Sequence, residues 1–353
     1  MPAKSNISTI AIDAMGGDHG PQVTVPASIN FLKKVDSSTH RIILVGKLEL
    51  IQPLIDKHDG AGLLSSGSLS LQGASEVVEM DESPALALKR KKDSSMRVAI
   101  NLVKSGEAQA AVSAGNTGAL MATARFVLKT ISGVDRPAII STMPCEDTSQ
   151  TAHMLDLGAN VDSTPEMLVQ FAVMGSVLTE FADKKEEPRV ALLNVGAEEI
   201  KGSEKVKKAS ALLSDSKLNY VGYIEADEIF SSRVDVIVCD GFEGNVALKA
   251  SEGTAKMILN VLREEFTRNT FTKMLAVLVK PIFKAMQMRL DPRLHNGATL
   301  IGLNGIVVKS HGGTDEIGFL QAILEASKQA DMDVIGHMSQ EISKVFADQK
   351  TQS

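Results

Sequence analysis

Residues 108–121 read Ala108-Gln109-Ala110-Ala111-Val112-Ser113-Ala114-Gly115-Asn116-Thr117-Gly118-Ala119-Leu120-Met121. The apolar run that ends at Val112 indicates a short buried strand, and Ala119–Leu128 indicates a helix. Small residues between them allow a sharp turn and a close approach by a ligand. The first N–H groups of a helix have no partner within it, and the helix dipole makes that end positive. We therefore predict a phosphate-binding site at this turn, although an ordinary tight turn has the same pattern.

The same order of strand, turn and helix occurs at the start of the chain. Ser8–Asp13 and Arg41–Gly46 read as buried strands, and residues 22–35 and 48–58 read as helices. This alternation predicts an α/β fold, with a mostly parallel sheet and helices on both faces. Neither a repeat nor a linker rich in Pro, Gly or Ser divides the chain. We expect a single domain over residues 1–353.

Polar side chains follow several predicted strands at the point where each strand ends. Four of them are Asp13, Asp156, Asn194 and Asp240, each with glycine close behind. Ligands of parallel α/β sheets bind outside the carboxyl ends of the strands, so these residues predict one polar crevice. Each of them could equally be a turn former that satisfies its own backbone. The predicted substrate-binding residues are Asp13, Gly16, Gly17, Asp18, Ser94, Ser95, Ser113, Asn116, Thr117, Gly118, Asp156, Asn160 and Asn245.

The predicted catalytic residues are Lys92, His311, Asn194 and Asp240. Lys92 would neutralise phosphate charge, but the run Lys89–Lys92 reads equally well as a solvated face, and Lys309 and Lys201 are rivals for the role. An imidazole titrates near neutral pH, so His311 is the candidate for proton transfer, with His153 as its rival. Carboxylates at such a crevice can also bind a divalent metal, but the sequence assigns no metal ligand.

Composition excludes some classes of function. The 353 residues carry a net charge of -6, with no Trp and 4% aromatic residues, which argues against nucleic-acid binding. Cys145 and Cys239 have no metal-ligand or redox spacing. We see no signal peptide and no apolar run long enough to cross a membrane, so we expect a cytoplasmic protein.

The segment Arg268–Arg289 differs from the rest of the chain because it combines many apolar residues with five Lys and Arg and no acid. We expect Pro281 to break or kink its helix and give an apolar, cationic helical hairpin over residues 266–290. Anionic lipid attracts such segments, so this hairpin predicts peripheral contact with the inner face of the membrane. The alternative is a dimer interface. The predicted membrane contacts are Leu275, Leu278, Ile282 and Phe283.

Taken together, the motifs resemble one family, the phosphate acyltransferases of bacterial phospholipid synthesis called PlsX. The matching stretches are Ile12-Asp13-Ala14-Met15-Gly16-Gly17-Asp18, Lys91-Lys92-Asp93-Ser94-Ser95-Met96, Ser113-Ala114-Gly115-Asn116-Thr117-Gly118-Ala119-Leu120-Met121, Asp156-Leu157-Gly158-Ala159-Asn160, Gln170-Phe171-Ala172-Val173-Met174-Gly175, Leu192-Leu193-Asn194-Val195-Gly196, Asp240-Gly241-Phe242-Glu243-Gly244-Asn245 and Lys309-Ser310-His311-Gly312. Each stretch is weak by itself, but the ordered set is specific.

The resemblance implies transfer of a long-chain acyl group from acyl carrier protein to inorganic phosphate, which gives acyl phosphate. It also implies a fold similar to isocitrate dehydrogenase and phosphotransacetylase, a homodimer, no redox cofactor, and a downstream glycerol-3-phosphate acyltransferase as a further partner. Three alternatives stay open. They are a phosphotransacetylase-like enzyme that uses acyl-coenzyme A, a decarboxylating dehydrogenase of the same general fold, and a membrane adaptor without catalysis.

Overall fold

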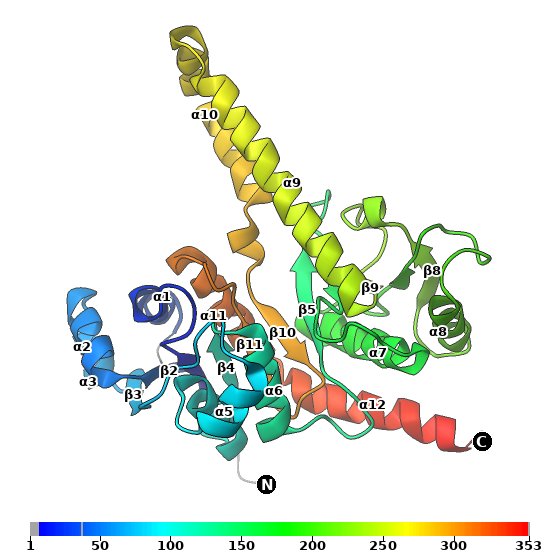
Figure 1. Ribbon diagram of the computed structural model, residues 1–353, viewed down its shortest axis with the longest axis horizontal. Helices are drawn as coiled ribbons and strands as arrows, with labels where there is room; N and C mark the ends of the chain where they lie inside the picture. The colour runs from blue at the N-terminus through cyan, green and yellow to red at the C-terminus, as the bar shows by residue number, and fades with distance from the viewer. Residues whose placement is uncertain (1–6, 37, 352–353) are drawn as a thin grey trace.

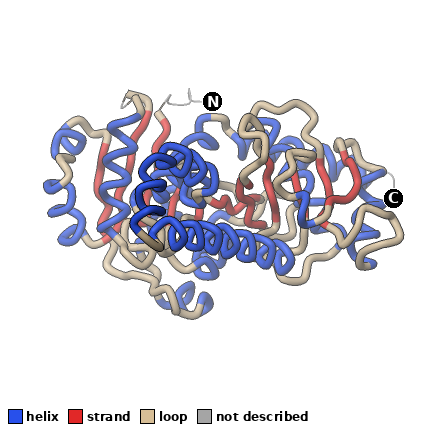
Figure 2. The backbone as a smooth tube through the Cα atoms, turned by 90° about the horizontal axis from the view of Figure 1, so that it is seen from above, coloured by secondary structure: helices blue, strands red, loops and turns tan. Residues whose placement is uncertain are grey.

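The computed structural model describes residues 7–36 and 38–351, except for the side chains of residues 287, 289, 290, 292 and 345–351. Arg289, which the sequence places in the cationic segment, is therefore described only by its backbone. One sheet of eleven strands runs through the molecule, and helices lie on both sides of it (Figures 1 and 2). The predicted α/β class is confirmed. The single domain over residues 1–353 stays a prediction.

The strands are β1 (Ser8–Asp13), β2 (His40–Gly46), β3 (Leu69–Gly73), β4 (Ala110–Ser113), β5 (Ala138–Met143), β6 (Ala152–Leu155), β7 (Val190–Leu193), β8 (Tyr220–Ile224), β9 (Val236–Val238), β10 (Ala298–Ile301) and β11 (Ile306–Lys309). Their order across the sheet is β3-β2-β1-β4-β11-β10-β5-β6-β9-β7-β8. The pairs β11–β10, β10–β5 and β5–β6 are antiparallel, and the other pairs are parallel. The strands on the β1 side of β10 therefore run opposite to those on the β9 side of β5.

The helices are α1 (Pro21–Lys34), α2 (Leu48–Lys57), α3 (Ala61–Ser65), α4 (Pro84–Arg90), α5 (Ser95–Ser105), α6 (Thr117–Leu128), α7 (Pro165–Ala182), α8 (Glu204–Ser214), α9 (Gly241–Thr267), α10 (Thr270–Leu290), α11 (Glu316–Asp331) and α12 (Val334–Thr351), with short 3-10 turns η1 (Ala226–Glu228) and η2 (Pro292–His295).

Alternate residues of each strand supply opposite faces of the sheet. In β1, Ile10 and Ile12 pack with α1 and α11, whereas Ala11 faces the cluster built by α5 and α6. In β9, Val236 and Val238 pack with α7, α8 and α12, whereas Ile237 faces the opposite cluster. Burial on both faces explains why these strands read as continuous apolar runs.

Helices α9 and α10 form an antiparallel hairpin that projects from the sheet (Figure 1). Its turn lies at Arg268–Asn269, where the Asn269 side chain caps α10. Pro281 does not break the helix, contrary to our expectation, and α10 continues through it to Leu290. The hairpin therefore begins at Gly241 and is longer than the segment 266–290. Among the described residues, no helix is long and apolar enough to cross a membrane.

Candidate active site

The floor of the candidate site lies where β1 and β4 end side by side. Asp13 and Ser113 are buried, and Ser113 Oγ donates a hydrogen bond of 2.6 Å to Asp13 Oδ2. The same hydroxyl accepts from the backbone N–H of Gly115 at 3.0 Å. A Cβ at Gly16 would lie 2.6 Å from Asp13 Oδ2 and 2.8 Å from the Gly115 nitrogen. Glycine at position 16 is therefore needed for the two loops to meet.

Asp13 has one oxygen that is not satisfied. Its Oδ1 is buried and finds no hydrogen-bond partner among the described residues. Burial raises the pKa of Asp13 above its ordinary value, and the hydrogen bond from Ser113 offsets this only in part. A buried unsatisfied oxygen is costly, and a role in binding or catalysis is one explanation for it. Asp13 is therefore suited to accept a hydrogen bond from a ligand, or to donate one when protonated.

Lys309 is the cation of this floor. It ends β11 next to Ser113 of β4, and the residue is 9% exposed. Its Nζ lies 3.3 Å from the carbonyl oxygen of Ala114 and also contacts the carbonyl oxygen of Ser310. Burial lowers the pKa of Lys309 to about 8, against the opposing effect of Asp13 and Asp18. No local pattern in the sequence predicts this burial, which is why Lys309 appears there only as a rival to Lys92.

His311 follows this lysine and is held by the backbone around it. Its N–H donates to Asn296 Oδ1 at 3.0 Å, and its Nδ1 accepts from the N–H of Gly313 at 3.1 Å. The proton of the neutral imidazole is therefore on Nε2. The side chain is exposed, which leaves Nε2 available for proton transfer.

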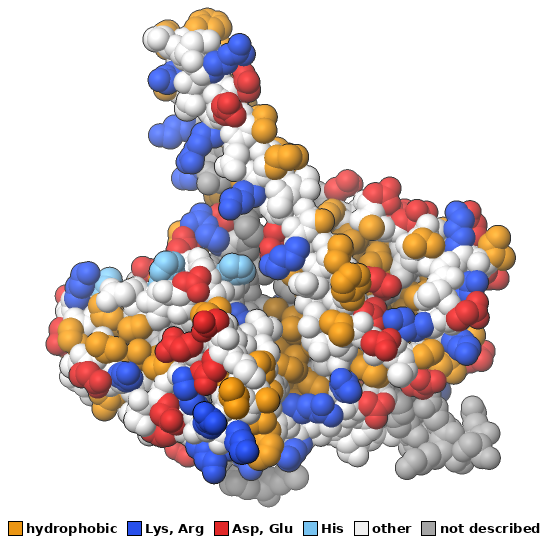
Figure 3. Space-filling model, in the orientation of Figure 1, with side chains coloured by type: hydrophobic (Ala, Val, Ile, Leu, Met, Phe, Trp, Pro, Cys, Tyr) orange, Lys and Arg blue, Asp and Glu red, His pale blue; other side chains and the backbone are white. Residues whose placement is uncertain are grey.

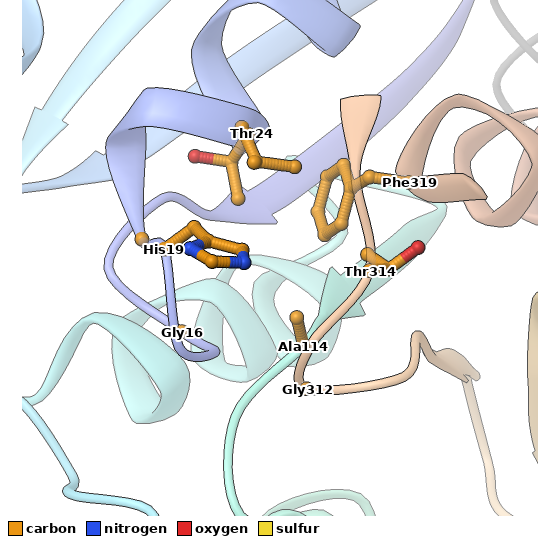
Figure 4. Close-up of a pocket in the computed structure, with 9 residues that line it drawn as sticks. Gly16, His19, Thr24, Ala114, Gly312, Thr314 and Phe319 are labelled. Atoms are coloured by element: carbon orange, nitrogen blue, oxygen red, sulfur yellow. The ribbon is translucent and has the colours of Figure 1, made fainter. Parts of the chain in front are cut away.

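A shallow hollow adjoins the floor. Gly16, Ala114 and Gly312 line it together with His19, Thr24, Thr314 and Phe319 (Figure 4). Gly17 has a φ of 90°, and the Asp18 N–H donates to the carbonyl oxygen of Gly312 at 2.9 Å, so the β1 loop and the loop after β11 are joined. His19 is absent from the sequence-based set because a lone histidine in a turn carries no signal of its own.

Some polar groups of the predicted phosphate turn already make hydrogen bonds within the protein. Asn116 Oδ1 caps α6 by accepting from the N–H of Ala119 at 2.9 Å, and its Nδ2 donates to the carbonyl oxygens of Met80 and Glu82. Thr117 and Gly118 are exposed, and their backbone N–H groups have no acceptor among the described residues. These two amides, rather than the Asn116 side chain, are the free donors of the turn.

The segment before α5 is arranged differently from the prediction. Ser94 caps α5 and donates to the carbonyl oxygen of Lys91, and Ser95 is buried in the first turn. Lys91 pairs with Glu82 at 2.6 Å. Lys92 is exposed, and the described residues give it no side-chain partner. Its catalytic role stays a prediction, and its geometry fits the alternative of a solvated face.

Asp156 and Asn160 form a second group at the end of β6. Asp156 is fully buried and accepts from the N–H groups of Ile139, Ala159 and Asn160 and from Asn160 Nδ2. A Cβ at Gly244 would lie 1.9 Å from the Asp156 carbonyl oxygen. These contacts fix the start of α9, near Asn245, against the loop that follows β6. Both oxygens of the Asp156 carboxylate are occupied by hydrogen bonds within the protein.

Asp240 and Asn194 also hold local structure. Asp240 caps α9 through the N–H of Phe242, accepts from the N–H of Ser163 at 2.7 Å, and pairs with Lys205 at 2.9 Å. Burial by itself would raise the pKa of Asp240, but these donors outweigh it and lower the pKa. Asn194 Nδ2 donates to the carbonyl oxygens of Gly196 and Lys201.

Asp13 follows a strand that runs opposite to those before Asp156, Asn194 and Asp240, because the three successive antiparallel pairs β11–β10, β10–β5 and β5–β6 reverse the strand direction. The four strand ends are therefore not equivalent, and one polar crevice lined by all four residues stays a prediction. The charge of Lys249 on α9 also acts on Lys309 and lowers its pKa, after the larger effect of burial. Lys249, like His19, was not predicted.

The remaining candidate histidine and the two cysteines do not belong to this site. The rival His153 is buried and binds Asp183 at 2.6 Å. Burial raises the pKa of both Cys145 and Cys239, which makes them poor nucleophiles. Within the described part of the chain, no three His, Cys, Asp or Glu side chains come together as a metal site would need.

The chain is similar to known proteins over nearly its whole length. A family model described as "Fatty acid synthesis protein" matches residues 8–337. A phosphate acyltransferase from Alkalilimnicola ehrlichii is 54% identical over 339 residues, which cover 96% of this chain and 97% of the relative. One from Chromobacterium violaceum is 54% identical over 336 residues and covers 95% of each chain.

Solved structures share the fold at low identity. A phosphotransacetylase from Streptococcus pyogenes aligns with a TM-score of 0.62 and 17% identity, covering 92% of this chain and 94% of that chain. The EutD phosphotransacetylase from Staphylococcus aureus aligns with a TM-score of 0.57 and 16% identity, with the same coverage. The expected phosphotransacetylase-like fold is confirmed.

Proposed function

Because this chain belongs to the family of fatty acid synthesis proteins and is an acyltransferase, we propose that it transfers a long-chain fatty acyl group from acyl carrier protein to inorganic phosphate. The product would be acyl phosphate, used in phospholipid synthesis by a downstream glycerol-3-phosphate acyltransferase. The observation that carries the proposal is the full-length likeness to curated phosphate acyltransferases at 54% identity. That likeness also confirms the resemblance drawn from the motifs.

The floor of the site supports phosphate as the acceptor. The N–H groups of Thr117 and Gly118 lie in the first turn of α6, where the helix dipole favours an anion. Lys309 supplies a buried positive charge beside Asp13. An anion that enters here would meet the N–H donors of the turn and the positive charge of Lys309, which also faces the carboxylates of Asp13 and Asp18.

In the proposed reaction a phosphate oxygen attacks the thioester carbonyl carbon. A C–O bond forms, the C–S bond breaks, and the electron pair leaves with the sulfur, which takes a proton. Phosphate is itself the nucleophile, so the residues of the site contribute by positioning and by stabilising developing charge. We propose Lys309 and Nε2 of His311 as the donors of that proton, because Lys309 is buried at the floor and Nδ1 of His311 accepts from Gly313.

The hairpin supports an apolar product and delivery at a membrane. Leu278 and Ile282 are 76% and 70% exposed, and Leu275 is exposed beside them. Phe283 instead packs edge-on against Phe266 with ring centroids 4.6 Å apart, so it joins α9 to α10. We propose that the exposed residues contact anionic lipid at the inner face of the membrane, and that the protein is a cytoplasmic homodimer.

The direct test is to mix the protein with long-chain acyl carrier protein and inorganic phosphate and to trap acyl phosphate with hydroxylamine. We expect acyl hydroxamate that depends on phosphate, and release of the free carrier thiol in equal amount. Acyl-coenzyme A of the same chain length is the control donor. Acyl hydroxamate from acyl-coenzyme A alone would contradict the proposed donor, and no product from either donor would contradict the proposed reaction.

A further inference from the structure

The segment Pro84–Lys129, which contains α4, α5 and α6, has a charge opposite to that of the whole chain. It carries eight Lys and Arg against two Asp and Glu, whereas the whole chain has 37 Lys and Arg against 43 Asp and Glu. The rest of the chain therefore has 29 basic and 41 acidic residues. Both α4 and α5 pack on α6, so the three helices present one continuous surface. Lys and Arg side chains gather over α5 in Figure 3.

Apolar side chains are exposed within this basic surface. Phe126 is 51% exposed, with the Arg97 guanidinium 5.4 Å and the Lys129 ammonium 4.9 Å from its ring centroid. Leu86 of α4 is 46% exposed. An exposed aromatic ring within reach of two cations, with a second apolar residue on the same group of helices, has the composition of a protein interface.

The cations of this surface have few acidic partners of their own. Glu82 pairs with Lys91, and Asp93 is held by the hydroxyl and the N–H of Ser75. Lys89, Arg90 and Arg125 are exposed and have no acidic partner among the described residues. Like charges that are left together repel one another, so the arrangement favours a partner that brings negative charge.

We propose that α4, α5 and α6 form the docking surface for the acidic acyl carrier protein. This proposal rests on the proposed function, because it takes the carrier as the donor of the acyl group. The surface borders the site: Pro84 of α4 lies against Gly118, and Asn116 binds the carbonyl oxygens of Met80 and Glu82. A carrier docked here would deliver its thioester beside the free amides of the phosphate turn.

Two other readings are less consistent with the structure. The second basic cluster, Lys205–Lys208, is largely neutralised, because Lys205 pairs with Asp240 and Lys207 with Glu204. Anionic lipid could also attract the basic surface, but α5 and α6 lie at the end of the molecule opposite the hairpin tip (Figure 1). A hairpin resting on a membrane would leave this surface directed away from the lipid and open to a soluble partner.

The test is charge reversal with two variants, Lys89→Glu with Arg90→Glu, and Arg125→Glu alone. Neither changes a residue of the floor or of the phosphate turn. We expect KM for acyl carrier protein to rise about tenfold or more, with unchanged turnover of acyl-coenzyme A and unchanged KM for phosphate. Added salt should raise KM for the carrier in the wild-type protein and have less effect in the variants. Lys207→Glu with Lys208→Glu is the matched control and should behave as wild type.

The outcomes separate this proposal from the proposed function. Equal loss with carrier and with acyl-coenzyme A, or an unchanged KM for the carrier, would overturn the docking surface while leaving the reaction intact. Loss of vesicle binding in these variants, with normal carrier kinetics, would assign the surface to lipid instead. If the wild-type protein forms no acyl phosphate, the proposed function fails, and titration of acyl carrier protein into wild type and variants still tests docking by affinity.

Discussion

The most informative single residue is Lys309, because a buried lysine must balance a charge or exchange a proton. Its pKa of about 8 lies below the value of about 10.4 for a free lysine. The ammonium therefore loses its proton as pH rises through about 8, and the unfolded chain holds that proton up to a higher pH. If the reaction needs the ammonium, activity falls as pH rises from about 8 towards about 10. A free lysine would stay protonated over most of that range.

We expect Lys309→Met to lower kcat at least tenfold, which corresponds to about 1.4 kcal/mol of transition-state stabilisation. We also expect it to abolish the fall of activity with rising pH near 8. Lys309→Arg should keep a positive charge and move that fall to higher pH, although its side chain is larger. The measurement is a pH profile of kcat for each folded variant. A merely structural lysine would lower the thermal midpoint and leave the shape of the profile unchanged.

Thr117 tests the phosphate turn more cleanly than Asn116. The Thr117 side chain is exposed at the start of α6, whereas Asn116 holds both the helix and the loop at Met80. We expect Thr117→Val to raise KM for phosphate several-fold and to leave stability and carrier KM unchanged. Asn116→Ala should instead lower the free energy of unfolding by about 1 kcal/mol, as loss of a helix cap does. An unchanged phosphate KM in Thr117→Val would show that the Thr117 hydroxyl does not bind phosphate and would leave only the two backbone N–H groups of the turn as donors.

At the scale of elements, a buried ion network joins β6, the end of α7 and α11. Asp183 binds His153 at 2.6 Å, contacts Lys328, and accepts from Thr151 Oγ1 at 3.0 Å. Burial alone would raise the pKa of Asp183, but His153 and Lys328 outweigh it and hold the pKa far below its ordinary value. The ionised carboxylate thus stabilises the fold above the ordinary pKa of about 4, and this stability is lost as pH falls below it.

Asp183→Asn should therefore lower the free energy of unfolding by about 3–5 kcal/mol at neutral pH, the usual cost of breaking a buried pair. The deficit should shrink as pH falls below about 4, because the unfolded wild-type chain then binds a proton at Asp183 that the folded chain does not. Asp331→Asn is the matched control, because Asp331 pairs with His40 at the surface and should contribute less than about 1 kcal/mol. Denaturant unfolding at pH 7 and at about pH 2 measures both. Equal deficits for the two variants would show that the network is not a stabilising unit.

Local elements of this chain could be predicted from sequence, but their long-range pairing could not. The predicted bounds of β1 agree with the structure, and the predicted starts of α1, α2 and α6 differ by at most two residues, because apolar period and turn residues are local signals. The reversal of strand direction between β11 and β6 depends on which strands pair, and no local pattern reports it. The burial of Lys309 could not be predicted for the same reason, because it depends on the packing of three loops that are distant in the sequence.

Pro281 shows how tertiary packing overrides a local rule. Proline removes a backbone hydrogen bond and disfavours the interior of a helix. Here α10 packs along the length of α9, and contacts such as Phe266 with Phe283 hold the two helices together. The helix therefore continues where the sequence indicated a break, and the projecting hairpin is built from two long helices rather than from two short ones.

At the scale of the whole molecule, the hairpin places an apolar surface far from the sheet. Leu278 and Ile282 are exposed on α10, in a stretch whose Lys273, Lys280 and Lys284 add positive charge. Each cation near an anionic bilayer contributes roughly 1 kcal/mol, and burial of each leucine or isoleucine side chain about 1.5–3 kcal/mol. These contributions are large enough for reversible binding at the surface of a membrane without a spanning helix.

We expect Leu278→Glu with Ile282→Glu to abolish co-sedimentation with vesicles that contain anionic lipid, while turnover of soluble substrates stays near the wild-type rate. The glutamates remove apolar burial and place negative charge next to a negative surface, so both contributions are lost together. Val195→Glu with Ile200→Glu is the matched control, because these side chains are 76% and 83% exposed but lie outside the hairpin. Light scattering measures the oligomeric state of each variant. A hairpin variant that still binds vesicles would contradict the membrane contact, and one that becomes monomeric would assign the same apolar surface to the interface between two copies of the chain.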